Sequence, residues 1–139
     1  MKTIKQSSVI PFRRNGDAFD VMLITSRNDG LWILPKGHLE PDMTPAESAE
    51  QEAWEEAGVT GQLYPDRVYA YDFPRFGNTI DVEMYLLEFD TVHDTWQEAD
   101  FRERKLLPLE EAIDLVEYKE LKTVLRNLPL YVEDLRSPS

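Results

Sequence analysis

The order of elements along the chain predicts an α/β fold built on a mixed β-sheet flanked by helices. Alternating apolar residues typical of strands fill the first part of the chain and return in its middle, and a strongly punctuated helix separates the two groups. Helical periodicity appears again near the C-terminus. Strands, a helix, more strands and terminal helices, in that order, are typical of a layered α/β domain.

The N-terminal strands are separated by clear turn signals. We expect strands near Thr3–Arg13 and Phe19–Thr25 and a short one at Leu31–Leu34, with turns at 15–17 and 28–30, which read Asn-Gly-Asp and Asn-Asp-Gly. The later elements are expected as strands near Arg67–Asp72 and Thr79–Phe89 and as helices near Leu109–Val116 and Lys119–Leu128.

The helix between the two strand groups is defined by its own ends. Thr44 is a good N-cap, Pro45 suits the first helical position, and Glu47 completes a capping box with Thr44. Gly58 suits the residue just past the C-terminal end. The pattern therefore predicts a helix over Pro45–Ala57.

Three carboxylates in the second half of this helix need a cation. Glu52, Glu55 and Glu56 have spacings i, i+3 and i+4, so we expect their side chains to converge on one face. Like charges at these spacings repel by about 0.2–0.5 kcal/mol per pair, and the C-terminal end of the helix dipole is also negative. A neighbouring stripe of small residues, which would let the helix pack closely on a sheet, consists of Ala46, Ala49, Ala53 and Ala57.

The segment before the helix can add oxygen ligands. We expect Leu34–His38 to form a tight turn whose backbone carbonyls face the carboxylates, which together make an all-oxygen site suited to Mg²⁺ or Mn²⁺. Zinc is disfavoured because the chain has no cysteine and only two histidines. The alternative is a solvated acidic face on an acidic protein.

The glycine and glutamates of this region resemble the signature of a known family. The pattern G-x5-E-x7-R-E-U-x-E-E-x-G-U, in which U is aliphatic, is typical of the Nudix hydrolases, which cleave nucleoside diphosphates linked to another group. Two positions depart from it, because Met43 stands for the first glutamate and Gln51 for the arginine. The matching residues are Gly37, Glu52, Ala53, Glu55, Glu56, Gly58 and Val59.

The resemblance implies an α/β/α sandwich, a single domain over residues 1–139, and a divalent metal held by Glu52, Glu55, Glu56 and the Gly37 carbonyl. In the family, the missing glutamate and arginine are thought to brace the loop against the helix. Loss of both partners leaves no unpaired charge, so we expect the metal cluster to survive and the protein to be active. A catalytically silent nucleotide-binding domain is the alternative.

Segments outside the signature resemble particular branches of the family. Pro74 is in a position typical of ADP-ribose pyrophosphatases and Phe76 in one typical of dinucleoside polyphosphate hydrolases, and we favour an ordinary loop role for Pro74. Over Arg102–Ala112 the chain is also similar to the diphosphoinositol polyphosphate phosphohydrolases. Four segments look like the asymmetric diadenosine tetraphosphate hydrolases: Ser7–Arg14, Leu34–Pro41, Leu107–Ala112 and Tyr118–Lys122.

A polyphosphate substrate needs cations and aromatic rings beside the metal. Lys36 is the strongest candidate phosphate contact, followed by Arg75 and Arg104. The resemblance places an adenine-stacking ring at Tyr118, and Phe76 could close the other side of the base. Each of these could instead be a surface or packing residue. The expected substrate-binding residues are Lys36, His38, Phe76, Arg104 and Tyr118.

A carboxylate must accept the proton of the attacking water. Glu55 or Glu56 could do so from within the helix. Family members often use a further acid before the last helix, and the sequence does not choose among the candidates Glu98, Asp100 and Glu103.

Composition sets the context. At 139 residues with 42% hydrophobic content, the chain is long enough for one domain with its own core. A net charge of −12 disfavours long nucleic acids as partners, and no stretch resembles a membrane span or a signal peptide. We expect a cytoplasmic protein that acts on a small molecule, and the sequence does not indicate its protein partners.

These features predict a Mg²⁺-dependent pyrophosphohydrolase, with Mn²⁺ as the alternative ion. The preferred reaction cleaves diadenosine tetraphosphate asymmetrically to ATP and AMP, by metal-assisted attack of water on phosphorus. The alternatives are hydrolysis of ADP-ribose, inositol pyrophosphates or nucleoside triphosphates, nucleotide sensing by a weakened site, and an acidic helical interaction module.

Overall fold

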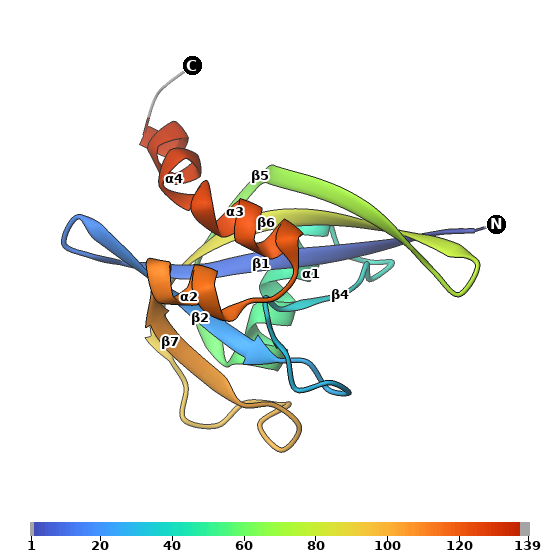
Figure 1. The fold of residues 1–139 in the computed structure, drawn as a ribbon, viewed down its shortest axis with the longest axis horizontal. Helices are drawn as coiled ribbons and strands as arrows, with labels where there is room; N and C mark the ends of the chain where they lie inside the picture. The colour runs from blue at the N-terminus through green and yellow to red at the C-terminus, as the bar shows by residue number, and fades with distance from the viewer. Residues whose placement is uncertain (1, 137–139) are drawn as a thin grey trace.

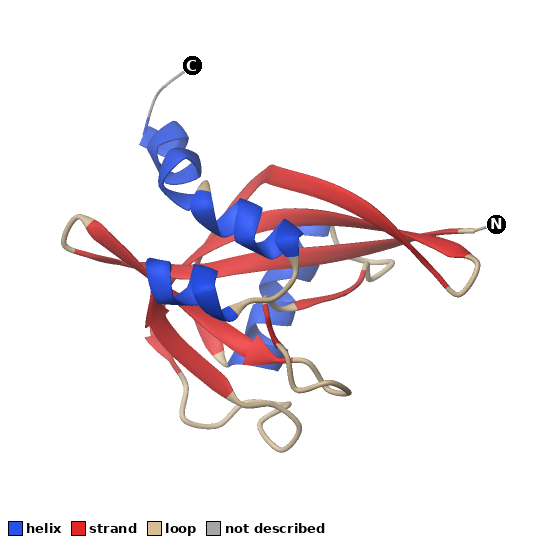
Figure 2. Ribbon diagram, viewed as in Figure 1, coloured by secondary structure: helices blue, strands red, loops and turns tan. Residues whose placement is uncertain are grey.

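One mixed sheet lies between two groups of helices in the computed structural model, which describes residues 2–136 (Figures 1 and 2). The strands are β1 (Thr3–Asn15), β2 (Ala18–Thr25), β3 (Trp32–Ile33), β4 (Lys36–His38), β5 (Val59–Arg75), β6 (Asn78–Val92) and β7 (Arg104–Pro108). The helices are α1 (Pro45–Glu52), the π-helical turn η1 (Ala53–Ala57), α2 (Leu109–Leu115), α3 (Lys119–Arg126) and α4 (Leu128–Arg136).

Strand β1 connects most of the sheet. It pairs in parallel with β6 over residues 3–12, and antiparallel with β4 over 6–8 and with β2 over 12–15. The order along the sheet is β3-β2-β1-β6-β5, with β4 paired to β1 and β7 paired to β2. Parallel and antiparallel neighbours therefore coexist, which confirms the predicted mixed sheet.

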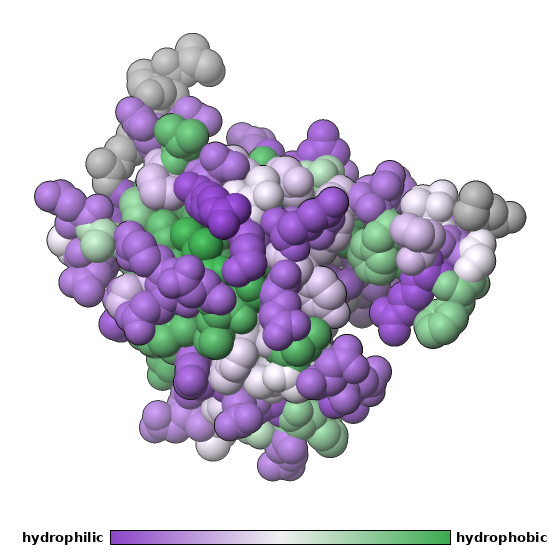
Figure 3. Space-filling model, viewed as in Figure 1, coloured by the Kyte–Doolittle hydropathy of each residue, from purple (hydrophilic) through white to green (hydrophobic). Residues whose placement is uncertain are grey.

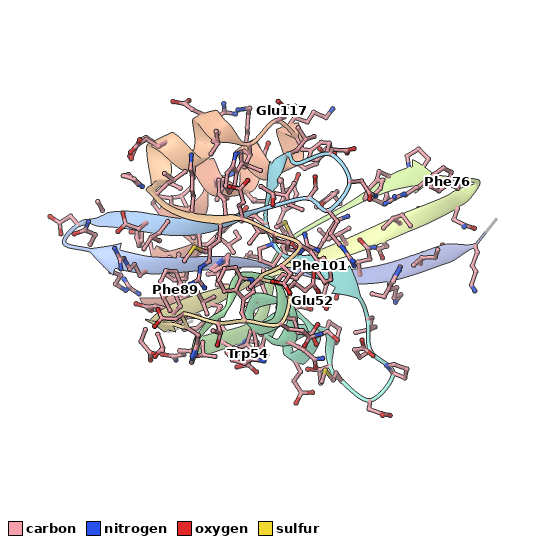
Figure 4. The ribbon with its side chains drawn as sticks, turned by 90° about the horizontal axis from the view of Figure 1, so that it is seen from below. Glu52, Trp54, Phe76, Phe89, Phe101 and Glu117 are labelled. Carbon is pink, nitrogen blue, oxygen red and sulfur yellow. The ribbon has the colours of Figure 1, made fainter. Side chains whose placement is uncertain are left out.

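The two faces of the sheet bury separate cores. Along β2, Val21 and Leu23 pack beneath the C-terminal helices, while Met22 and Ile24 pack beneath α1. The predicted alanine stripe of α1 and η1 lies in this second core. The outer surface over α2–α4 is mainly hydrophilic, with apolar side chains in separate patches (Figure 3). Figure 4 shows the resulting layers, with α1 on one side of the sheet and the C-terminal helices on the other.

Several strands differ from the sequence prediction. β5 begins at Val59 rather than at Arg67, because an edge strand with many exposed polar side chains hides the alternating pattern. Lys36–His38, expected in a tight turn, forms β4 on the flank of β1 instead. Strand β7 was not predicted, because its charged residues mask a segment that pairs with β2.

Helix α4 extends the chain beyond the last predicted helix. Pro129 is tolerated in its first turn, because the N–H that proline lacks would be unpaired there in any case. Within residues 2–136, none of the helices is both long and apolar enough to cross a membrane.

Candidate active site

The helix that carries the carboxylates begins and ends as its sequence predicts. Thr44 Oγ1 accepts a hydrogen bond from Glu47 N (3.1 Å), and Glu47 Oε1 accepts one from Thr44 N (2.9 Å), so the capping box is confirmed. At the other end, Gly58 has a left-handed φ of 67°, which glycine adopts without strain. The last turn, Ala53–Ala57, is a π-helix rather than an α-helix.

The π-turn changes which carboxylates meet. In this wider i→i+5 turn, a residue four positions on lies more directly above its partner than in an α-helix. Glu52 and Glu56 are 8% and 5% exposed and lie close enough for each to shift the pKa of the other. Glu55 instead accepts a hydrogen bond from Gln51 Nε2 (2.7 Å). The expected convergence of three carboxylates is therefore corrected to a buried pair with Glu55 at its side.

Burial makes this pair hold a proton. It raises the pKa of Glu56 to about 9, with further increases from the charge and hydrogen bond of Glu52, while Arg102 and the backbone N–H of Lys36 oppose the shift. Burial also raises the pKa of Glu52, although the hydrogen bond with Glu56 lowers it in part. Two acids this close and this buried do not both ionise unless a cation joins them.

The residues fit a divalent metal ion. A cation between Glu52 and Glu56 would replace the shared proton, and carboxylate oxygens are the donors that Mg²⁺ and Mn²⁺ prefer. Gly37 leaves room for the pair, because a Cβ at this position would lie 2.5 Å from the Glu52 carboxylate. In the described part of the chain, no three acidic or histidine side chains are already grouped as metal ligands. A complete metal site would therefore need Glu55 or a backbone carbonyl as a further ligand.

Arg102 is the residue of this site that sequence reasoning missed. Its side chain is 8% exposed, and it donates hydrogen bonds to Glu98 Oε1 (2.8 Å), Thr25 O (2.8 Å) and Glu56 Oε2 (3.2 Å). A cluster of buried carboxylates indicates that a cation should be near. The sequence could not show which one, because Arg102 is 46 residues from Glu56 along the chain.

Arg102 contacts one of the three candidate bases. Glu98 is half-buried, and its charge acts on the acidic pair, where it raises the pKa of Glu52. The Glu98 N–H also donates to Glu55 O (3.0 Å), which ties this loop to the end of the helix. The other two candidates, both exposed, are Asp100 and Glu103.

A cavity of about 380 Å³ adjoins the acidic pair. Lys36 connects the two, because its backbone N–H donates to Glu56 Oε1 (3.1 Å) while its side chain lines the cavity. Lys36 Nζ lies 5.0 Å from the Phe73 ring centroid, and burial lowers the Lys36 pKa. Tyr118, the expected base-stacking residue, also lines this cavity, together with Arg75.

Three further residues of the cavity wall were not selected from the sequence. Tyr71 and Phe73 stack along β5, with ring centroids 6.1 Å apart and an interplanar angle of 22°. Arg27 adds a cation from the loop after β2. The alternation of aromatic residues at 69, 71 and 73 was the available signal, but the predicted strand ended at Asp72.

Two expected substrate-binding residues and Pro74 lie elsewhere. Phe76 is at the tip of the β5–β6 hairpin, 90% exposed and far from Glu52 (Figure 4). His38 ends β4 with an exposed side chain and does not line the cavity. Pro74, expected in a loop, lies in β5 opposite Thr79, where an edge strand tolerates a missing N–H.

Arg104 is committed to the end of the helix. Its guanidinium donates to Ala57 O (2.9 Å) and His93 O (2.6 Å) and lies 3.8 Å from the centroid of the Trp96 ring. These two hydrogen bonds hold the C-terminal end of η1 against the start of the loop after β6. The expectation that Arg104 contacts phosphate is therefore corrected to a structural role.

Comparison with known proteins places this geometry in a family. The model of the Nudix domain matches residues 4–128. The chain belongs to the Nudix family. This Nudix protein is 35% identical over 121 residues to Nudix hydrolase 21, chloroplastic, of Arabidopsis thaliana, a match that covers 84% of this chain and 61% of that protein.

Two other similarities extend the comparison. Diphosphoinositol polyphosphate phosphohydrolase 2 of Mus musculus is 27% identical over 115 residues, covering 81% of this chain and 63% of that protein. The chain spans about three-fifths of the length of these two curated relatives. The crystal structure of a C. elegans Ap4A hydrolase binary complex superposes with a TM-score of 0.79 at 22% identity, covering 94% of this chain and 98% of the other, which confirms the α/β Nudix fold.

Proposed function

We propose that this Nudix protein is a Mg²⁺-dependent hydrolase that cleaves diadenosine tetraphosphate to ATP and AMP. One observation carries the proposal: an aromatic-walled cavity lies beside a buried acidic pair, and Lys36 belongs to both. A nucleobase held in the cavity would leave its phosphate chain within reach of the carboxylates. Ap4A hydrolase is also the description of the structural neighbour with the same fold.

The cavity has the chemistry of a nucleotide site. Tyr71, Phe73 and Tyr118 offer ring faces for a base, and stacking on an aromatic side chain is worth about 1–3 kcal/mol per base. Lys36 and Arg75 supply positive charge for the phosphates in a protein that is otherwise strongly acidic. We assign these five residues to substrate binding.

The acidic pair would hold the metal. Glu52 and Glu56 would be its principal ligands, with Glu55 and the Gly37 carbonyl as the further oxygen donors. Bound Mg²⁺ would neutralise charge on the phosphate oxygens and lower the pKa of a nearby water.

Glu98 is the best-placed general base, because it is half-buried beside the pair and is not bonded to it directly. It would accept a proton from water as the oxygen bonds to phosphorus. The bridging P–O bond on the other side of that phosphorus then breaks, which releases ATP from one half of the substrate and AMP from the other.

Inositol pyrophosphates are the second candidate substrates, because one relative is a diphosphoinositol polyphosphate phosphohydrolase. Two features of the cavity disfavour them. Asp29 and Glu120 in its wall would repel a densely phosphorylated ring. An inositol ring is also not aromatic, so it would not stack on the aromatic side chains of the cavity.

Product analysis by chromatography tests the proposal. The purified protein is incubated with diadenosine tetraphosphate, ADP-ribose, a nucleoside triphosphate or an inositol pyrophosphate, each with and without Mg²⁺. We expect equal amounts of ATP and AMP from the first substrate, only with metal. Selective cleavage of any other substrate would replace the assignment. Nucleotide binding without turnover would instead indicate a sensor.

The metal assignment has its own test. Glu56→Gln keeps the size of the side chain but removes one charge from the pair, so we expect turnover to fall by about 100-fold or more. Full activity in this variant would remove Glu56 from the metal site. Glu50→Gln, an exposed change on the same helix, is the matched control and should be silent.

A further inference from the structure

The brace of the Nudix signature is missing from its usual place in this chain. Met43 carries no charge, and Gln51 binds Glu55 Oε1 (2.7 Å), one turn along the same helix. Neither side chain can form the ion pair expected at these positions. A different segment, the loop after β6 that carries Glu98, also lies against the end of the helix, where Glu98 N donates to Glu55 O (3.0 Å).

Arg102 joins three separate segments at this point. Its guanidinium reaches Glu56 on the helix, Glu98 in the loop between β6 and β7, and the carbonyl of Thr25 at the end of β2. The backbone beside it is also anchored, because Glu103 N donates to Thr25 Oγ1 (2.9 Å) and Thr25 N donates to Glu103 O (3.0 Å). Hydrogen bonds therefore fix both the backbone next to Arg102 and its guanidinium.

Stability alone does not account for this arrangement. A buried ion pair gains little net stability, because the cost of removing charges from water offsets their attraction. A planar guanidinium does, however, fix the orientation of two carboxylates at once, which an ammonium does not. Among the side chains described, those of residues 2–135, Arg102 is the only lysine or arginine ion-paired with Glu52, Glu55 or Glu56.

We infer that Arg102 is a positioning residue that braces the loop after β6 against the helix and holds Glu98 in place as the general base. The inference rests on the proposed hydrolase function. Arg102 itself touches neither the water nor the phosphorus in this scheme. It acts through Glu98, whose carboxylate it holds at 2.8 Å, while its other nitrogens fix the distance of that loop from the metal-binding pair.

A double-mutant cycle tests this role. Arg102→Gln, Glu98→Gln and the double variant are compared for kcat and KM on the substrate that the wild type cleaves. We expect each single change to lower kcat by about 10- to 100-fold with KM within about threefold, and the double variant to be no slower than Glu98→Gln. Arg102→Lys should recover part of kcat, because lysine keeps the positive charge but cannot bind two carboxylates in the fixed planar geometry of a guanidinium.

Two controls separate positioning from general damage. Arg14→Gln removes another arginine–carboxylate pair, Arg14 to Glu88 (2.8 Å), and should leave kcat unchanged. Mn²⁺ affinity, measured by electron paramagnetic resonance, should fall by much less than kcat in Arg102→Gln, because Arg102 contacts the ligand Glu56 but is not itself a ligand.

The outcomes are distinguishable. Losses that multiply in the double variant, or a loss of Mn²⁺ affinity that matches the loss of kcat, would overturn the role of Arg102 while an active wild type still supports the hydrolase. A wild type that cleaves none of the substrates would remove the proposed function, and the role of Arg102 with it.

Discussion

At the residue scale, the buried pair Glu52 and Glu56 makes the fold sensitive to protons and metal. The pKa of Glu56 is about 9 in the folded protein, whereas a glutamate in an unfolded chain has a pKa of about 4.3. Between these values the folded state binds more protons than the unfolded state. This group therefore destabilises the fold progressively as the pH rises from about 4.3 towards 9.

Glu56→Gln should remove this pH dependence of stability in the absence of metal. Glutamine does not titrate, so the variant's Tm relative to the wild type should increase from about pH 5 to about pH 8 in EDTA. Mg²⁺ should raise the Tm of the wild type more at the higher pH, because the metal replaces the proton, and should have little effect on the variant. Circular dichroism melts measure both effects, and an equal Mg²⁺ effect in the two proteins would contradict the assignment.

Gly37→Ala should damage the site while sparing the fold. The new Cβ would lie 2.5 Å from the Glu52 carboxylate, which can move away as the end of a flexible side chain. We expect Mn²⁺ affinity and turnover to fall by about 10- to 100-fold. Gly16→Ala is the control: its φ of +63° makes alanine strained, so it should lower Tm without changing turnover. Normal Mn²⁺ binding by Gly37→Ala would show that metal binding does not depend on the observed position of the Glu52 carboxylate.

At the scale of elements, the helix α1 depends on its capping box and the site depends on the π-turn that follows. Thr44 and Glu47 satisfy each other's backbone N–H groups at the first turn. The wider η1 turn then aligns Glu52 with Glu56 and leaves Glu55 beside Gln51. The N-terminal end of this helix therefore contributes to stability, and its C-terminal end positions the carboxylates of the site.

Thr44→Ala should lower the free energy of unfolding by about 0.5–2 kcal/mol, because it removes the cap of Glu47 N and breaks the box. Urea denaturation measures the change. Thr95→Ala, at an exposed threonine outside the helices and strands, should stay within about 0.5 kcal/mol of the wild type. A Thr44→Ala variant as stable as that control would mean that packing of the alanine stripe alone holds the helix.

At the scale of the whole molecule, the cavity is assembled from distant parts of the chain. Its wall combines the loop after β2, strand β4, the far half of β5 and the start of α3. The sheet order brings these segments together on the face opposite α1, and Lys36 connects that face to the acidic pair.

Tyr118→Ala should raise KM for the nucleotide by about 5- to 150-fold, which corresponds to the 1–3 kcal/mol of one stacked ring. Tyr118→Phe keeps the ring and should stay close to the wild type. Phe76→Ala should also leave KM unchanged, because that side chain is 90% exposed at the hairpin tip. Steady-state kinetics on all three variants decides, and a KM effect at Phe76 alone would return the base-binding role to that residue.

Much of the fold and part of the site could be predicted because their signals are local. The capping box of Thr44, the left-handed Gly58 and the alanine stripe all follow from spacing within one helix. The roles of Arg104 and Phe76 could not be predicted in this way. A guanidinium or a ring is defined by what lies next to it, and those neighbours come from other segments.

By itself, the sequence determined the mixed sheet, the helix with its carboxylates and the family, because periodicity, caps and motif spacing act over a few residues. Only the tertiary structure decided that Glu52 and Glu56 form the pair, that Arg102 is the cation bonded to Glu56, and that Tyr71 and Phe73 line one cavity with Tyr118. The physical reason is burial. It sets the pKa of a carboxylate and the partner of a cation, and it exists only once strands and loops from the whole chain enclose the site.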